Sequence, residues 1–451
     1  QDLEKASENT DSRGLFYYPK KSKSGPEFSC QVGKRTVKRS LENNIKAIYL
    51  LGFFTGFLVV VPVFVPLLQD YGLSMSQVLQ TQALFALTIA LCEVPSGYVA
   101  DLWGRRNAIL VGSALNALGF FSLLWADSFV DFLIYEFILG VGFSLISGAD
   151  LALLYDTEVC LRKRGLRGGP GASKSLSRLI SVEAAASGAA GIAASVLLLW
   201  SMDSVVTVQA FTGFAPLLLA LLLVEAPRPV TVDKHPGGHS DNARKIVALL
   251  LFGKPVVAWT AFAITVFGLL AVYVFWIYQK YWEMQGIPLE HFGYIWAAFA
   301  LTVSLSARFS DALERLLGYR KLLVVIAVLP IAGLLGMAFG VGWMGVMFGF
   351  AIQISRGLSM SLFYEALNNR VPGEFRATVN SLVSLGVRST FIVTGPMLGL
   401  ALDTQGMQPT LFGLVAIFTP LMGLVLVPLV FRIRREKAEE ALQSSSQPAA
   451  A

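Results

Sequence analysis

Five charged residues stand inside long apolar runs of this 451-residue sequence, and they are its best candidates for chemistry. The acids Glu93, Glu136 and Asp150 lie in the first half, whereas the bases Arg356 and Arg388 lie in the second half. A charge in an apolar medium needs an opposite charge or a wet cavity beside it. A carboxylate in such a place can take up and release a proton, and an arginine can bind an anion. The residue types therefore indicate proton and anion handling in apolar surroundings, although structural ion pairs would explain them too.

A second set of residues in the same apolar runs could line a binding cavity. The set combines amides with aromatic side chains: Gln82, Asn116, Phe267, Tyr273, Trp296, Phe299 and Gln353. Amides between helices can bind a solute or only bridge two neighbouring helices. Aromatic side chains suit both an apolar cavity and ordinary core packing. The sequence leaves both interpretations open.

The composition is that of a helical membrane protein. Apolar residues make up 55% of the chain and charged residues 15%, against about 25% charged residues in soluble domains. The charges gather between apolar runs of about 20 residues, the length that crosses a bilayer. We therefore expect twelve transmembrane helices, at residues 45–68, 76–99, 107–126, 129–155, 179–200, 205–224, 255–280, 291–310, 322–339, 343–367, 378–402 and 410–431.

The basic residues predict how these helices are oriented. Lys and Arg gather in alternate loops, and such loops face the cytoplasm, so both termini are expected inside the plasma or inner membrane. Orientation also explains the net charge of +6, so nucleic acid is not an expected partner. The chain then divides into a cytoplasmic tail (1–44), a six-helix bundle (45–224), a cytoplasmic linker (225–253), a second bundle (254–432) and a tail (433–451).

One loop motif occurs twice. The stretch from Gly97 to Arg106 reads Gly-Tyr-Val-Ala-Asp-Leu-Trp-Gly-Arg-Arg, and a looser copy with Asp311 follows about 210 residues later. Residues 148–156 likewise resemble residues 357–365, at an offset of 209. Two copies of a six-span unit are typical of secondary transporters.

In the loop motif and the internal repeat, the sequence resembles the major facilitator superfamily. It departs from the family pattern at two points: Leu102 stands where a basic residue is usual, and the fifth span lacks the proline of the antiporter motif. The resemblance implies an all-α polytopic fold, with two pseudo-symmetric six-helix bundles around a central cavity that opens to each side in turn. It also implies that Asp101 faces the N-terminal end of the eleventh span and holds the cytoplasmic side closed. The residues of this gating loop are Gly97, Asp101, Gly104, Arg105, Arg106 and, in the second copy, Asp311.

We therefore expect a proton-coupled secondary active transporter of a small organic solute or amphiphile, with export favoured by the aromatic content. Glu93 or Asp150 is the predicted proton-titrating carboxylate, and Arg356 the predicted anion partner. Uptake of a specific nutrient or metal-chelate solute is one alternative, and a non-transporting receptor or regulator is another.

The sequence has no catalytic grouping, metal site or phosphate-binding loop, so we expect no enzyme activity and no cofactor, with a proton gradient as the energy source. The expected partners are the solute, protons and the lipid bilayer, and the expected state is a monomer.

Overall fold

The computed structural model describes residues 34–163, 172–226, 255–372 and 375–445, and within these ranges the chain is almost entirely helical, with no strand. The first half contains α1 (Lys34–Gly56), η1 (Val61–Val63), α2 (Phe64–Asp70), α3 (Met75–Trp103), α4 (Arg105–Ser122), α5 (Phe129–Ile146), α6 (Ala149–Lys163), α7 (Ala172–Leu198), α8 (Met202–Thr212) and α9 (Ala215–Leu222). The second half contains α11 (Pro255–Met284), η2 (Leu289–His291), α12 (Phe292–Arg308), α13 (Ser310–Phe339), α14 (Trp343–Arg370), α15 (Arg376–Gln405) and α16 (Met407–Ser445).

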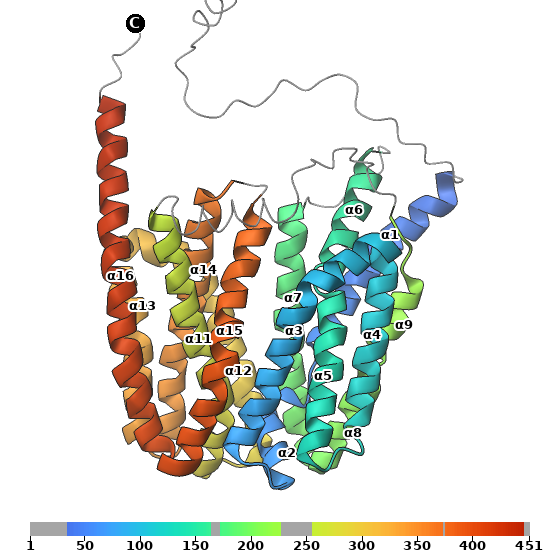
Figure 1. Cartoon of the computed structure of the whole chain (residues 1–451), viewed down its shortest axis with the longest axis horizontal. Helices are drawn as coiled ribbons and strands as arrows, with labels where there is room; N and C mark the ends of the chain where they lie inside the picture. Colours follow the sequence, from blue (N-terminus) through green and yellow to red (C-terminus); the bar gives the residue numbers. More distant parts are fainter. Residues whose placement is uncertain (1–33, 164–171, 227–254, 373–374, 446–451) are drawn as a thin grey trace, which may run out of the picture.

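These helices form two bundles that stand side by side (Figure 1). Ten helical segments of the described chain are long and apolar enough to cross a membrane. The shorter helices α4 and α12 run beside them at the positions expected for the third and eighth spans. The all-α polytopic fold is therefore confirmed.

Three of the expected spans are interrupted helices. Span one is α1, then η1, then α2. Its break runs from residue 57 to residue 63 and includes Pro62, whereas Pro66 lies in the first turn of α2. Span four breaks between α5 and α6, where Gly148 has a φ of +83°. Glu136 and Asp150 therefore lie on separate helical segments, α5 and α6. Span six divides into α8 and α9 at Gly213 and Phe214, both of which keep negative φ values.

The helices at the two ends of the chain extend beyond the predicted bundle limits. Helix α1 begins at Lys34, so residues 34–44 of the predicted tail are helical. Helix α16 continues to Ser445, past the expected limit at residue 432. Most of the predicted linker lies outside the described residues.

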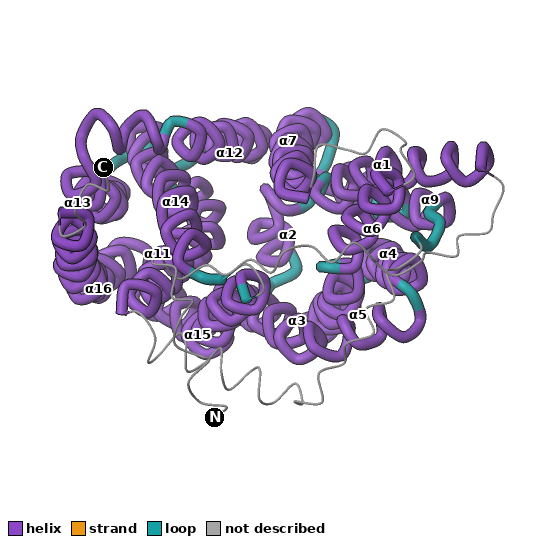
Figure 2. The backbone as a smooth tube through the Cα atoms, turned by 90° about the horizontal axis from the view of Figure 1, so that it is seen from above, coloured by secondary structure: helices purple, strands orange, loops and turns teal. Residues whose placement is uncertain are grey.

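The bundles meet along a seam that four helices form. Helix α3 packs on α15, and α7 packs on α12, as the view along the helices shows (Figure 2). We call the end of the seam where α3 ends and α15 begins the linker end, and the opposite end, where α2 and α8 lie, the far end (Figure 1). Under the predicted orientation the linker end faces the cytoplasm.

Candidate functional site

Two adjoining cavities lie at the seam. The second-half cavity has a volume of about 450 Å³ and is lined by α3, α11, α14 and α15. The first-half cavity, of about 490 Å³, lies among α3, α5, α7 and the interrupted first span. Both volumes suit a small organic molecule. The cavities share a wall made of Gln82, Phe85, Ile89, Phe275 and Trp276, so one ligand could occupy both.

Charged side chains of opposite sign line the two cavities. Arg356 of α14 and Arg388 of α15 line the second-half cavity. Glu136 of α5 and Glu183 of α7 line the first-half cavity. The sequence separates deep acids from deep bases in the same way, and the fold turns that separation into two adjoining chambers.

Glu93 and Arg388 form an ion pair across the seam. Arg388 Nη1 lies 3.0 Å from Glu93 Oε2, and the Ser381 hydroxyl donates to Glu93 Oε1 at 2.6 Å. Glu93 belongs to α3 and its two partners to α15, so these contacts join the bundles. The side chains of Glu93 and Arg388 are 37% and 32% exposed, so the pair is only partly buried.

Glu136 lies deeper than Glu93. Its side chain is buried, with 4% of the residue exposed, and its Oε1 accepts a hydrogen bond from Gln82 Nε2 at 2.5 Å. Because Gln82 lies on the shared wall, this bond connects the acid to both cavities. Gln82 thus orients Glu136 at the junction of the two chambers.

Asp150 lies in the first turn of α6, outside the lining of both cavities. It accepts a hydrogen bond from the backbone N–H of Leu151, and it lies close enough to Glu183 for the two charges to interact. The cavity residue of this acidic pair is therefore Glu183.

The predicted cavity residues divide between the cavity walls and the bundle interiors. Gln82 and Phe267 line the second-half cavity, and Trp296 lines the first-half cavity. The others lie outside both linings: Asn116, Tyr273, Phe299 and Gln353. Asn116 packs on Gly142, and Tyr273 donates to Thr394 while packing on Phe391 and Phe418. Phe299 packs on Tyr278, Trp282 and Phe350, and Gln353 is buried in α14. For these four, the structure favours helix packing.

At the far end, Gln279 of α11 closes the break in the first span. Its Oε1 accepts from the backbone N–H of Val65 at 2.8 Å, and its Nε2 donates to the carbonyl of Val61 at 3.0 Å. The side chain is fully buried. A glutamine from the second bundle thus replaces the helical hydrogen bonds that the break removes from the first.

Two further contacts hold the far end. The Asp403 carboxylate of α15 accepts from the backbone N–H groups of Met75 and Ser76, at 2.9 and 2.8 Å, and so caps the N-terminus of α3. On the other side of the seam, a Cβ built on Gly293 would lie 1.9 Å from the carbonyl oxygen of Gly191. The contact between α7 and α12 therefore requires glycine.

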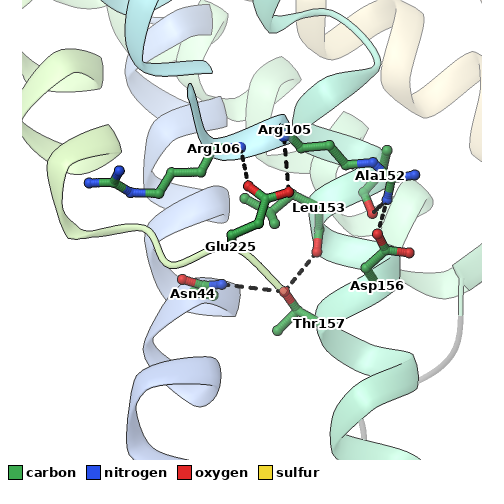
Figure 3. Close-up of polar contacts among 8 residues, drawn as sticks. All are labelled: Asn44, Arg105, Arg106, Ala152, Leu153, Asp156, Thr157 and Glu225. Atoms are coloured by element: carbon green, nitrogen blue, oxygen red, sulfur yellow. Dashed lines mark hydrogen bonds and ion pairs between the residues drawn. The ribbon is translucent and has the colours of Figure 1, made fainter. Parts of the chain in front are cut away.

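The loop from Gly97 to Arg106 is held by its own bundle (Figure 3). The Glu225 carboxylate accepts from the backbone N–H groups of Arg105 and Arg106, at 3.0 and 2.8 Å, and so caps α4. The Arg105 side chain pairs with Asp156 and the carbonyl of Ala152, both on α6. Gly104 has a φ of +99°, and a Cβ there would lie 3.1 Å from Glu225 Oε2. The positive φ therefore favours glycine at this turn, and a Cβ there would also require a small shift of the Glu225 carboxylate.

The other predicted gating residues lie on the surface at the linker end. Gly97 and Asp101 are exposed near the end of α3, and Asp311 is exposed in the first turn of α13. The latch role of Asp101 stays a prediction. Sequence analysis missed Glu225 because that residue lies at the start of the predicted linker, although an acid beyond a span end could have marked a helix cap.

The comparisons agree with this architecture. A family model described as Major Facilitator Superfamily matches residues 47–389. The chain belongs to that superfamily. The resemblance that the loop motif and the repeat suggested is therefore confirmed, and the family is one of transporters rather than enzymes. No curated protein sequence matches the chain.

Solved structures of superfamily members share the fold at low sequence identity. The nucleoside transporter NupG is 12% identical with a TM-score of 0.68, covering 86% of this chain and 98% of that one. A D-xylose-proton symporter is 11% identical with a TM-score of 0.66, covering 86% and 97%. A bacterial homologue of the lysosomal transporter Spinster, in an inward-facing and unoccupied conformation, is 16% identical with a TM-score of 0.63, covering 89% and 96%. At these identities the likeness concerns the fold.

Proposed function

We propose that this superfamily member is a proton-coupled secondary transporter that exports a small organic solute or amphiphile through the seam by alternating access. Glu93 takes up the transported proton, and Arg356 and Arg388 bind the solute. The cavity walls are largely apolar and aromatic, which suits an amphiphile and favours export.

The ion pair between Glu93 and Arg388 is the observation that carries the proposal. It joins the two bundles, it is only partly buried, and its arginine lines the second-half cavity. A proton on Glu93 removes the negative charge that holds Arg388, so the contact between the two bundles weakens. One proton thereby affects the closure of the linker end.

The conformational step is testable without a known solute. Spin labels on Leu102→Cys and Leu316→Cys, exposed residues of α3 and α13, report the width of the linker end. A second pair, Trp125→Cys with Val341→Cys, reports the far end. Electron–electron double resonance in nanodiscs should show a longer linker-end distance at acidic pH, because protonation of Glu93 breaks the pair. The background should lack the native cysteines.

The Glu93→Gln variant should show the longer linker-end distance at every pH, because it cannot form the ion pair. Glu314→Gln, which changes an exposed acid in the first turns of α13, is the matched control and should respond to pH as the native protein does. A linker-end distance that ignores both pH and Glu93→Gln would exclude this coupling mechanism.

Transport itself is measured in proteoliposomes with an internal pH dye and a panel of amphiphilic compounds. Compound movement in one direction should drive proton movement in the other. Glu93→Gln should abolish proton movement and leave compound exchange in place. If no compound moves and neither label pair changes its distance, the protein is better described as a non-transporting receptor of the same fold.

A further inference from the structure

Among the described residues, two half-buried charges that line the cavities, Arg356 and Glu183, have neither an ion pair nor a side-chain hydrogen bond. Arg356 lines the second-half cavity and has no ion pair or hydrogen bond from its side chain within the described chain. Glu183 lines the first-half cavity and likewise has no ion pair there, with the carboxylate of Asp150 as a charged neighbour. Uncompensated charges in apolar surroundings are costly, so each suits a ligand group of opposite charge.

The surroundings of each charge reinforce its sign. Arg388 lines the cavity of Arg356, so an anion there meets two guanidinium groups. Glu136 lines the cavity of Glu183, so a cation there meets two carboxyl groups. Ser187, one helical turn from Glu183, lines the same cavity and adds a hydroxyl acceptor.

Aromatic rings occupy the space between the two charged regions. Phe275 and Trp276, both on the shared wall, have ring centroids 4.8 Å apart, and Phe275 lies 4.7 Å from Trp296. Phe64 of the interrupted first span lies 6.0 Å from Trp276. These rings offer stacking contacts to an apolar or aromatic body that extends from one cavity into the other.

From these three features we infer the substrate class: an amphiphilic zwitterion. Its anionic group binds Arg356 and Arg388, its cationic group binds Glu183 and Glu136, and its apolar body lies on the aromatic wall. The inference rests on the proposed transport function and adds a charge pattern to it. A simple anion would leave the acids of the first-half cavity uncompensated, and a simple cation would leave Arg356 uncompensated. The zwitterion satisfies both cavities at once.

A set of four related compounds tests the charge pattern on the purified full-length protein in nanodiscs. The probes are phenylalanylphenylalanine, its N-acetyl form (anion only), its methyl ester (cation only) and the doubly blocked form (neutral). Binding is measured by tryptophan fluorescence, because Trp276 and Trp296 line the cavities. The zwitterion should bind at least about tenfold more tightly than either singly blocked form, a difference of about 1.4 kcal/mol, and the neutral form should bind weakest.

Two variants should separate the charges. Arg356→Gln should weaken binding of the zwitterion and of the N-acetyl form, and leave the methyl ester unchanged. Glu183→Gln should weaken binding of the zwitterion and of the methyl ester, and leave the N-acetyl form unchanged. Glu314→Gln is the control, and size-exclusion profiles with melting temperatures verify the folding of each variant.

The proposal is overturned if the four forms bind equally, if none of them binds, or if each variant weakens all four alike. Binding of the N-acetyl form at the affinity of the zwitterion would show a simple anion site instead. None of these results bears on the pH response of the spin labels, so a failed zwitterion hypothesis and a failed transport mechanism remain distinguishable.

Discussion

At the far end of the seam the two bundles meet through main-chain groups, whereas at the linker end they meet through side chains. Gln279 and Asp403 both accept from backbone N–H groups of the opposite bundle, and Gly191 lies directly against Gly293. At the linker end, the contacts of Glu93 with Ser381 and Arg388 join carboxylate, hydroxyl and guanidinium groups.

The difference determines what can open each end. A backbone N–H does not change its charge with pH, so the far-end contacts depend on geometry and on exclusion of water. The linker-end contact depends on one partly exposed carboxylate and its ion pair. A proton there removes the ion pair across the seam, whereas the far-end contacts of Gln279 and Gly191 contain no titratable group and respond only through the movement of whole bundles.

Replacing Gln279 should have the largest effect on the far end. Gln279→Leu keeps most of the side-chain volume but leaves the Val65 N–H and the Val61 carbonyl without their partner. Each buried unpaired group costs about 1–3 kcal/mol. We expect a lower melting temperature and a longer, broader distance between labels at positions 125 and 341.

The matched control for Gln279→Leu is Gln209→Leu. Gln209 is also buried, and its Oε1 accepts from the backbone N–H of Val60 in the same interrupted span, but it belongs to the first bundle. This variant should lower the melting temperature and leave the far-end distance unchanged. Equal widening in both variants would mean that the break in the first span, rather than the contact across the seam, sets the far-end width.

Asp403→Asn should have an intermediate effect. The amide keeps one acceptor oxygen but loses the charge that two backbone N–H groups of α3 share. Loss of a helix N-cap costs about 0.5–2 kcal/mol, and because Asp403 is exposed we expect a value near the lower limit. The far-end label distance should broaden, and added salt should reduce the difference from the native protein.

Asp203→Asn serves as the control for Asp403→Asn. Asp203 is an exposed acid in the first turn of α8, at the same end of the molecule. Among the described residues, its side chain makes no hydrogen bond to the second bundle. This variant should leave the far-end distance as it is. A far-end distance that Asp403→Asn does not change would show that the cap stabilises α3 without closing the seam.

The fold could be predicted from the sequence because a bilayer imposes one length and one composition on every span. The interruptions were only partly predictable. Pro62 lies in the break of the first span, whereas Gly148 breaks the fourth span without a proline. A lone glycine inside an apolar run is also common in regular membrane helices, where it permits close packing. The residue type alone therefore does not distinguish a broken helix from a regular one.

The site was predictable as a set of charges and not as a set of contacts. A charge in an apolar run is visible in one sequence, so Glu93, Arg356 and Arg388 could be named. The partners depend on which helices meet across the seam. Asp403 binds backbone groups that lie 327 and 328 positions away in the sequence. The residues around position 403 do not indicate these partners.

The smallest effect should come from Ser381→Ala at the linker end. The change removes one hydrogen bond to Glu93 Oε1 and leaves the ion pair with Arg388 in place. A hydrogen bond to a charged group contributes about 1.5–3 kcal/mol when buried, and less here because the pair is partly exposed. We expect a small lengthening between labels at positions 102 and 316, because the Glu93 carboxylate loses one of its two partners across the seam. Thr390→Ala is the control, since the Thr390 hydroxyl bonds the Gly386 carbonyl of its own helix. If Ser381→Ala moved the far-end labels as much as the linker-end labels, the two ends would be one cooperative contact, and the contrast between them would have no mechanical meaning.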